Sequence, residues 1–171
     1  MGKPTPEFQP LQLAVLTVSD SRDADNDTSG DYLREAAREA GHSVVDHAIV
    51  PDNLYRVRAI VSRWIASEDV QVVMVNGGTG FNPKNSTPEA LLPLFDREID
   101  GFGELFRMIS YEDIGGSTLQ SRAVAGMANQ TLIFAVPGST PACRSAWERI
   151  IADQVDARTR PCNFVSHLKK L

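Results

Sequence analysis

The sequence has little of what marks secreted, membrane and nucleic-acid-binding proteins. It contains two cysteines, Cys143 and Cys162, in no metal or redox spacing, which indicates reduced thiols in a cytoplasmic protein. No apolar run approaches the ~20 residues that a membrane-spanning helix needs. The first ten residues, MGKPTPEFQP, lack the apolar core of an export signal. A formal net charge of -5 argues against nucleic acid as a partner, because that binding depends on basic surface.

The rest of the composition is that of an ordinary globular chain. The chain has 171 residues, of which 42% are hydrophobic and 23% are charged, and this suits one domain with a sizeable core. We expect residues 1–10 to form a flexible N-terminal arm and residues 11–171 to form the domain.

Short apolar runs alternate with amphipathic segments along the chain. The runs at residues 13–18, 44–50, 70–75 and 131–136 are rich in β-branched residues and predict buried strands. The segments between them predict helices by their apolar spacing or their caps. These helices lie near residues 31–40, 53–65, 86–92, 102–109, 121–128 and 139–151, and Ser86 to Glu89 matches a capping box.

This alternation is typical of an α/β fold, with right-handed crossovers, a mostly parallel sheet and helices on both faces. We therefore predict a three-layer α/β/α sandwich. Ligands of such sheets bind outside the carboxyl ends of the strands. The loops that follow Val18, Val50, Val75 and Val136 are therefore the candidate binding loops.

The loop Gly77-Gly78-Thr79-Gly80 directly follows a predicted strand. Glycines allow positive φ and turn several backbone N–H groups toward one point, which makes a nest for an anion. A tight turn without a ligand explains the same residues equally well. The loop lacks the Lys-Ser/Thr of a Walker A sequence and the spacing of GxGxxG, so neither nucleotide motif applies.

Three other loops carry polar residues at the same predicted edge. Pro137-Gly138-Ser139 is either a phosphate seat or a plain helix cap. Asp52 is either a Mg²⁺ ligand beside a phosphate or a helix cap. The loop that begins with Ser19-Asp20 ends in Asp27-Thr28-Ser29-Gly30, a helix start that can present N–H groups to an anion. It is not an EF-hand, because Thr28 and Arg34 replace the required Gly and Glu.

Several separated motifs resemble one known family. "LTVSDSRDADNDTSGDYL", "IVPDN", "NGGTGFNPKNSTPEAL", "DREIDGFGELFRM", "SRAVAG" and "VPGST" occur in an order and spacing similar to those of the molybdopterin-binding MoaB/MogA family, which is related to the gephyrin G domain. The resemblance runs from about Leu11 to Ile151. It implies an α/β/α fold, a homo-oligomer built as a trimer or hexamer, and a molybdopterin site. In active members ATP and Mg²⁺ adenylylate the terminal phosphate of molybdopterin.

The resemblance places the family's GGTG loop on Gly77 to Gly80 and its metal-binding Asp on Asp52. The resemblance also implies a second Asp that helps catalysis in active members. Asn85 stands at that position here, and Pro141 stands near a position where the family commonly has Lys. An amide carries no negative charge for Mg²⁺ and is no base. We expect Asp52 and Asn85 at the catalytic position and Asp52 on the metal. We expect the ligand on Ser19, Asp20, Asp27, Ser29, Gly30, Gly77, Gly78, Thr79, Gly80, Pro137, Gly138 and Ser139.

Three functions remain open at this point. The first is a molybdopterin-binding protein of molybdenum cofactor biosynthesis, which Asn85 favours. The second is an active adenylyltransferase that uses ATP and Mg²⁺. The third lies outside the family and is a flavodoxin-like, anion-binding regulatory module.

Overall fold

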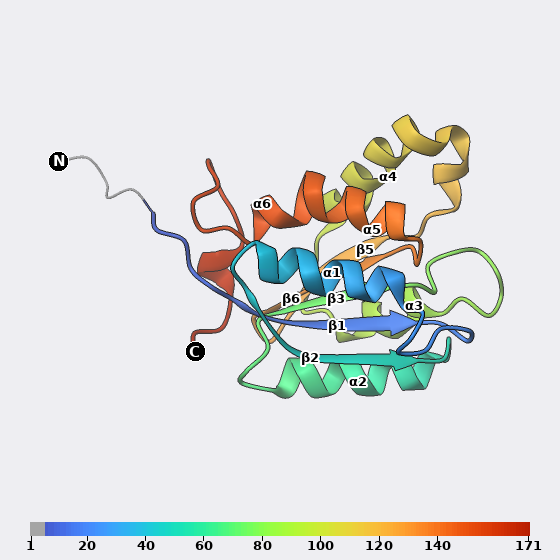
Figure 1. Cartoon of the computed structure of the whole chain (residues 1–171), viewed down its shortest axis with the longest axis horizontal. Helices are drawn as coiled ribbons and strands as arrows, with labels where there is room; N and C mark the ends of the chain where they lie inside the picture. Colours follow the sequence, from blue (N-terminus) through green and yellow to red (C-terminus); the bar gives the residue numbers. More distant parts are fainter. Residues whose placement is uncertain (1–5) are drawn as a thin grey trace.

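A computed structural model describes residues 6–171 of the chain (Figure 1). In chain order the strands are β1 (Gln12–Val18), β2 (Ser43–Val50), β3 (Val72–Asn76), β4 (Arg97–Glu98), β5 (Val124–Ala128) and β6 (Thr131–Val136). The α-helices are α1 (Thr28–Glu39), α2 (Leu54–Ala66), α3 (Thr87–Leu91), α4 (Asp100–Ile114), α5 (Thr140–Ala146) and α6 (Ala152–Gln154). Three 3₁₀ turns, η1 (Leu92–Leu94), η2 (Gly115–Gln120) and η4 (Val165–His167), and a π-helical turn, η3 (Trp147–Ile151), complete the elements.

The strands form one six-stranded sheet in the order β2-β1-β3-β6-β5-β4. The pairs β1–β2, β1–β3 and β3–β6 are parallel, whereas β5 pairs antiparallel with both β6 and β4. One buried cluster joins the sheet to α1, α4 and α5, and a second joins the opposite face to α2 and α3 (Figure 1). The predicted three-layer α/β fold with a mostly parallel sheet is thus confirmed.

One predicted element is wrong. Residues 121–128 do not form a helix, because Val124–Ala128 is strand β5. Its residues pair in register with β6, so that Ala125 lies opposite Phe134. The hairpin turns at Asn129 and Gln130, which both have positive φ. No glycine marks this turn in the sequence, and pairing with β6 outweighs the local preference of the alanines.

Residues 6–10 and the segment after α6 lie outside the sheet (Figure 1). The predicted N-terminal arm falls partly on residues 1–5, which lie outside the described residues; residues 6–10 form neither helix nor strand. Leu11, where the predicted domain begins, is buried. None of the helices formed by residues 6–171 has the length and apolar composition that a membrane crossing requires.

Candidate functional site

Three parallel neighbours, β1, β3 and β6, end at the same edge of the sheet. The loops that follow them therefore meet there, as the sequence predicts. Together with η2 they line an open cavity of about 450 Å³. Its lining comprises Thr17, Val18, Ser19, Arg22, Asn76, Gly77, Gly78, Thr79, Gly80, Asn85, Ile114, Ser117, Gln120, Ser121, Pro137 and Gly138.

Close backbone contact between these loops requires glycine. Gly77 has φ of +98°, and a Cβ there would lie 2.1 Å from the Val18 carbonyl oxygen. A Cβ on Gly138 would lie 3.1 Å from the Gly77 Cα. Any larger residue at Gly77 would push the loops after β1 and β3 apart. The glycines therefore bring three strand ends close enough to share one cavity.

The glycine loop offers unpaired donors to this cavity. Among the described residues, no protein acceptor takes the N–H groups of Gly78, Thr79 or Gly80. Gly78 also has positive φ, at +69°. Backbone N–H groups presented in this way suit an anion such as phosphate. The helix that follows adds little, because α3 spans only 5 residues.

The predicted capping box at the start of α3 is wrong. Ser86 is the N-cap residue, but its side chain caps no helix N–H. Its hydroxyl instead donates to Asp52 Oδ1 at 3.0 Å. Glu89, the other half of the predicted box, pairs with Arg122. The Ser86 side chain therefore links the start of α3 to Asp52, and the Glu89 side chain links α3 to Arg122.

The Asp52 carboxylate is engaged by the loop that carries Asn85. Asn85 Nδ2 donates to Asp52 Oδ2 at 2.8 Å, and the Ser86 backbone N–H donates to Oδ1 at 3.0 Å. The Ser86 hydroxyl also donates to Asp52 Oδ1. Both carboxylate oxygens thus have donors from the protein. Asp52 links the end of β2 to the glycine loop.

These donors argue against Mg²⁺ at Asp52. A magnesium ion needs oxygen ligands free of competing donors, and more than one where the protein alone holds it. Residues 6–171 contain no group of three or more His, Cys, Asp or Glu side chains that could hold a metal. Asn85 supplies an N–H to Asp52 in place of a second carboxylate. The residues present do not fit the ion.

Asp20 is also occupied by a protein partner. Its carboxylate lies 2.5 Å from Lys84 Nζ and accepts the Asp52 backbone N–H at 3.1 Å. The hydrogen bond from Lys84 lowers the pKa of this exposed carboxyl. Asp20 therefore carries its charge at neutral pH and holds the glycine loop near the end of β2.

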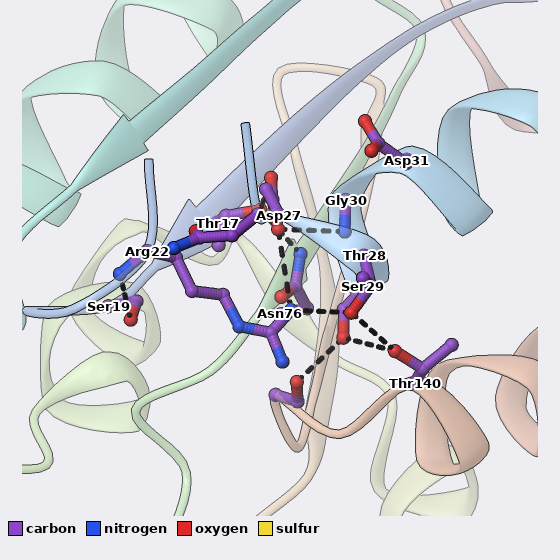
Figure 2. A network of polar contacts seen from close by, with 12 residues as sticks. Thr17, Ser19, Arg22, Asp27, Thr28, Ser29, Gly30, Asp31, Asn76 and Thr140 are labelled. Atoms are coloured by element: carbon purple, nitrogen blue, oxygen red, sulfur yellow. Dashed lines mark hydrogen bonds and ion pairs between the residues drawn. The ribbon is translucent and has the colours of Figure 1, made fainter. Parts of the chain in front are cut away.

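A buried polar network lies beside the cavity at the start of α1 (Figure 2). Asp27 accepts from the Gly30 N–H at 3.0 Å and from Thr17 Oγ1 at 2.7 Å. The Gly30 N–H is therefore bound within the protein and is not presented to a ligand. Ser29 Oγ donates to the Gly138 carbonyl at 2.8 Å, which ties α1 to the loop after β6.

The predicted ligand residues thus fall into two groups. Ser19, Gly77, Gly78, Thr79, Gly80, Asn85, Pro137 and Gly138 line the cavity. Asp20, Asp27, Ser29, Gly30, Asp52 and Ser139 do not, and most of them hold the loops in place. Ser139 caps α5 through the Ala142 N–H.

Sequence reasoning assigned no role to several lining residues. Arg22 carries the only charge among the described residues that line the cavity, and its guanidinium lies 3.5 Å from Asp27 Oδ1. A single arginine in an otherwise acidic loop is a sequence signal that could have identified Arg22 as a site residue. A polar residue at the end of a buried strand is a second such signal, and it could have identified Asn76, the last residue of β3. The residues of η2, such as Ser117, come from a segment without periodicity and gave no signal.

Comparisons with known proteins show the family to which the chain belongs. Residues 14–157 match the family described as "Probable molybdopterin binding domain". The chain is 66% identical to molybdenum cofactor biosynthesis protein B of Escherichia coli strain K12, over 99% of this chain and 100% of that protein.

Solved structures give the same result. A crystal structure of molybdenum cofactor biosynthesis protein B superposes with a TM-score of 0.84 at 42% identity, covering 86% of this chain and 92% of the other. The tungsten cofactor synthesizing protein MoaB from Pyrococcus furiosus gives a TM-score of 0.75 at 34% identity, covering 83% and 91%. The chain therefore belongs to the molybdopterin-binding family of cofactor biosynthesis proteins that these relatives represent.

Proposed function

We propose that the chain binds molybdopterin in the cavity at the carboxyl edge of the sheet and serves molybdenum cofactor biosynthesis. The observation that carries the proposal is the convergence of the Gly77–Gly80 loop and the Pro137–Gly138 turn on one cavity of about 450 Å³. That volume lies within the range of small-molecule sites, ~300–1,000 Å³. The similarity to the Escherichia coli protein supports the same pathway.

The terminal phosphate of molybdopterin would lie against the glycine loop. The free N–H groups of Gly78 to Gly80 can each donate to a phosphate oxygen. Arg22 supplies a positive charge at the same cavity, and its guanidinium can donate two parallel hydrogen bonds. These groups support phosphate binding without a metal ion.

We infer that this chain binds molybdopterin without adenylylating it. Nucleotidyl transfer depends on positioning and on neutralising phosphate charge, for which active relatives use Mg²⁺. Here Asn85 and Ser86 donate to both oxygens of Asp52. ATP and Mg²⁺ are therefore not part of the function that we propose. The flavodoxin-like alternative receives no support from the relatives.

We also propose that the chain assembles into a trimer-based homo-oligomer. α4 and η2 carry large apolar side chains on their outer surface, with Met108 64%, Tyr111 62% and Leu119 79% exposed. α4 lies at the margin of the molecule, next to the η2 segment (Figure 1). Large apolar side chains exposed on two neighbouring elements are typical of an interaction site. A second copy of the chain is the occupant that the family resemblance favours.

The test of the proposed function is a titration of the full chain with molybdopterin, with and without Mg-ATP, followed by analysis of the products. We expect saturable binding without Mg-ATP and no adenylylated product when Mg-ATP is added. Absence of saturable binding would contradict the proposal. Rapid formation of adenylylated molybdopterin with release of pyrophosphate would favour the adenylyltransferase instead.

A further inference from the structure

Two buried polar atoms lack hydrogen-bond partners, and both belong to residues that line the same cavity. Within residues 6–171 the buried side-chain atoms without a partner are Asn76 Oδ1 and Ser121 Oγ. Leaving such an atom unpaired costs stability, and folded proteins contain few of them. Two at one cavity indicate that the cavity receives a ligand with matching polar groups.

The orientation of the Asn76 amide is fixed by its neighbours. Nδ2 donates to the Leu16 carbonyl at 3.3 Å and to Thr17 Oγ1 at 2.9 Å. The Leu16 carbonyl can only accept, so the nitrogen must face β1. Thr17 Oγ1 in turn donates to the Asp27 carboxylate (Figure 2). The hydrogen bonds therefore lead from the Asn76 amide through the Thr17 hydroxyl to the Asp27 carboxylate, each group donating to the next. Oδ1 of Asn76 remains as an acceptor without a donor.

Ser121 reaches the cavity from another part of the sequence. It directly follows η2, and its backbone N–H donates to the Thr118 carbonyl at 2.9 Å. Its own carbonyl accepts from Arg107 Nη1 at 3.4 Å. The backbone is therefore held while the hydroxyl is left without a partner. A serine hydroxyl can both donate and accept.

These two atoms do not suit the phosphate. Asn76 Oδ1 only accepts, so it would repel an anionic oxygen and pair with an N–H group. The pterin ring of molybdopterin carries an amino group and a ring N–H beside carbonyl and ring-nitrogen acceptors. We propose that Asn76 and Ser121 are specificity-determining residues that bind the hydrogen-bonding edge of the pterin ring. This proposal rests on the proposed function and adds which residues recognise the heterocycle.

The first test is Ser121→Ala. The hydroxyl has no partner among residues 6–171 and its burial costs the free protein stability, so its removal should leave the thermal unfolding midpoint equal to or above that of the wild type. We expect the affinity for molybdopterin to fall about 5–10-fold, the loss of one hydrogen bond of ~1–1.4 kcal/mol. The matched control is Ser166→Ala, which removes an exposed hydroxyl outside this cavity and should bind as the wild type does.

The second test varies the ligand, because any replacement of Asn76 would also break its hydrogen bonds to β1. Free pterin and lumazine, in which a carbonyl replaces the 2-amino group, are compared as competitors of molybdopterin. We expect pterin to displace molybdopterin at lower concentration, since lumazine lacks the amino donor for Asn76. Equal displacement by the two, or none by pterin, would overturn the role of Asn76.

The outcomes separate the inference from the proposed function. Wild-type chain that binds molybdopterin, with a Ser121→Ala variant that binds it equally well, overturns the inference and leaves the proposed function standing. A Ser121→Ala variant that fails to fold would give the hydroxyl a structural role, and this also overturns the inference. Wild-type chain that does not bind molybdopterin at all overturns both.

Discussion

A single amide determines what the Asp52 carboxylate can bind. Asn85 Nδ2 lies 2.8 Å from Asp52 Oδ2 and donates to it. In Asn85→Asp a second carboxylate would occupy that place. Two carboxylates at this separation repel each other unless a proton or a cation lies between them. The substitution would therefore convert an internal hydrogen bond into a candidate Mg²⁺ position.

We predict that Asn85→Asp gains adenylyl transfer. With molybdopterin and Mg-ATP, pyrophosphate release should rise by ~10-fold or more over the wild type, equivalent to ~1.4 kcal/mol of barrier. Without Mg²⁺ the added charge should weaken molybdopterin binding. A wild type that already releases pyrophosphate as fast as the variant would contradict this explanation of Asn85.

Individual residues of the site could be predicted only where the signal was local. Gly77 to Gly80 stand out in the sequence because three glycines in four positions directly follow a predicted strand, at the edge of the sheet where ligands bind. Ser121 could not be found, because its significance depends on a cavity formed by distant loops. The sequence predicts the position of Asp52 near the ligand edge of the sheet. It does not predict the hydrogen bonds that Asn85 and Ser86 donate to the Asp52 carboxylate.

At the scale of the elements, the titratable side chain of His42 lies where the segment before β1 packs against the end of α1. His42 is buried, and its Nδ1 accepts the Leu11 backbone N–H at 3.1 Å. Its ring lies 5.2 Å from that of Phe8. Burial lowers the pKa of His42, and the nearby Asp156 opposes this shift. Protonation would remove the acceptor that holds Leu11.

We predict that acid destabilises the fold through His42. In the unfolded chain His42 binds a proton near the ordinary histidine pKa of ~6.5, which lies above the pKa of His42 in the folded protein. The contribution of His42 to stability is therefore complete above pH ~6.5 and is lost as the pH falls toward the pKa of the folded protein. The slope can reach ~1.4 kcal/mol per pH unit. Urea unfolding at pH 7.5 and 5.5 measures it. His42→Gln should reduce the dependence and exposed His47→Gln should not; equal dependence in both would contradict the prediction.

Element prediction succeeded where an apolar run was long and failed where tertiary pairing decided. The strands at 13–18, 44–50 and 131–136 are confirmed to within one residue at each end. The predicted helix at 121–128 is instead β5, whose antiparallel pairing with β6 no local pattern announces. β4 has only 2 residues and was likewise not predicted.

The fold of the whole molecule followed from the alternation of strands and helices. Parallel strands need crossover helices, and such helices cover both faces of the sheet. The outer surface is harder to predict, because exposed side chains of α4 such as Met108 read as part of an ordinary amphipathic helix. Its exposed apolar side chains became visible only in the folded chain.

We predict that this surface holds the oligomer together. Light scattering of the wild type at micromolar concentration should give the mass of three or six chains. Met108→Glu should shift the mass toward that of one chain, because it adds a charge to an apolar contact. Tyr55→Glu, at an exposed aromatic residue of α2, is the control and should not change the mass. A monomeric wild type would contradict the assembly.

The most direct measurement of the binding site is the molybdopterin titration carried out on a matched pair of glycine variants. A Cβ on Gly78 would lie 2.3 Å from Thr87 Oγ1, and φ there is +69°, so Gly78→Ala must reshape the loop. A Cβ on Gly116 would meet no atom within 4 Å. We predict a loss of affinity of ~10-fold or more for Gly78→Ala and wild-type affinity for Gly116→Ala. A folded Gly78→Ala variant that binds molybdopterin as tightly as the wild type would show that the ligand site lies elsewhere.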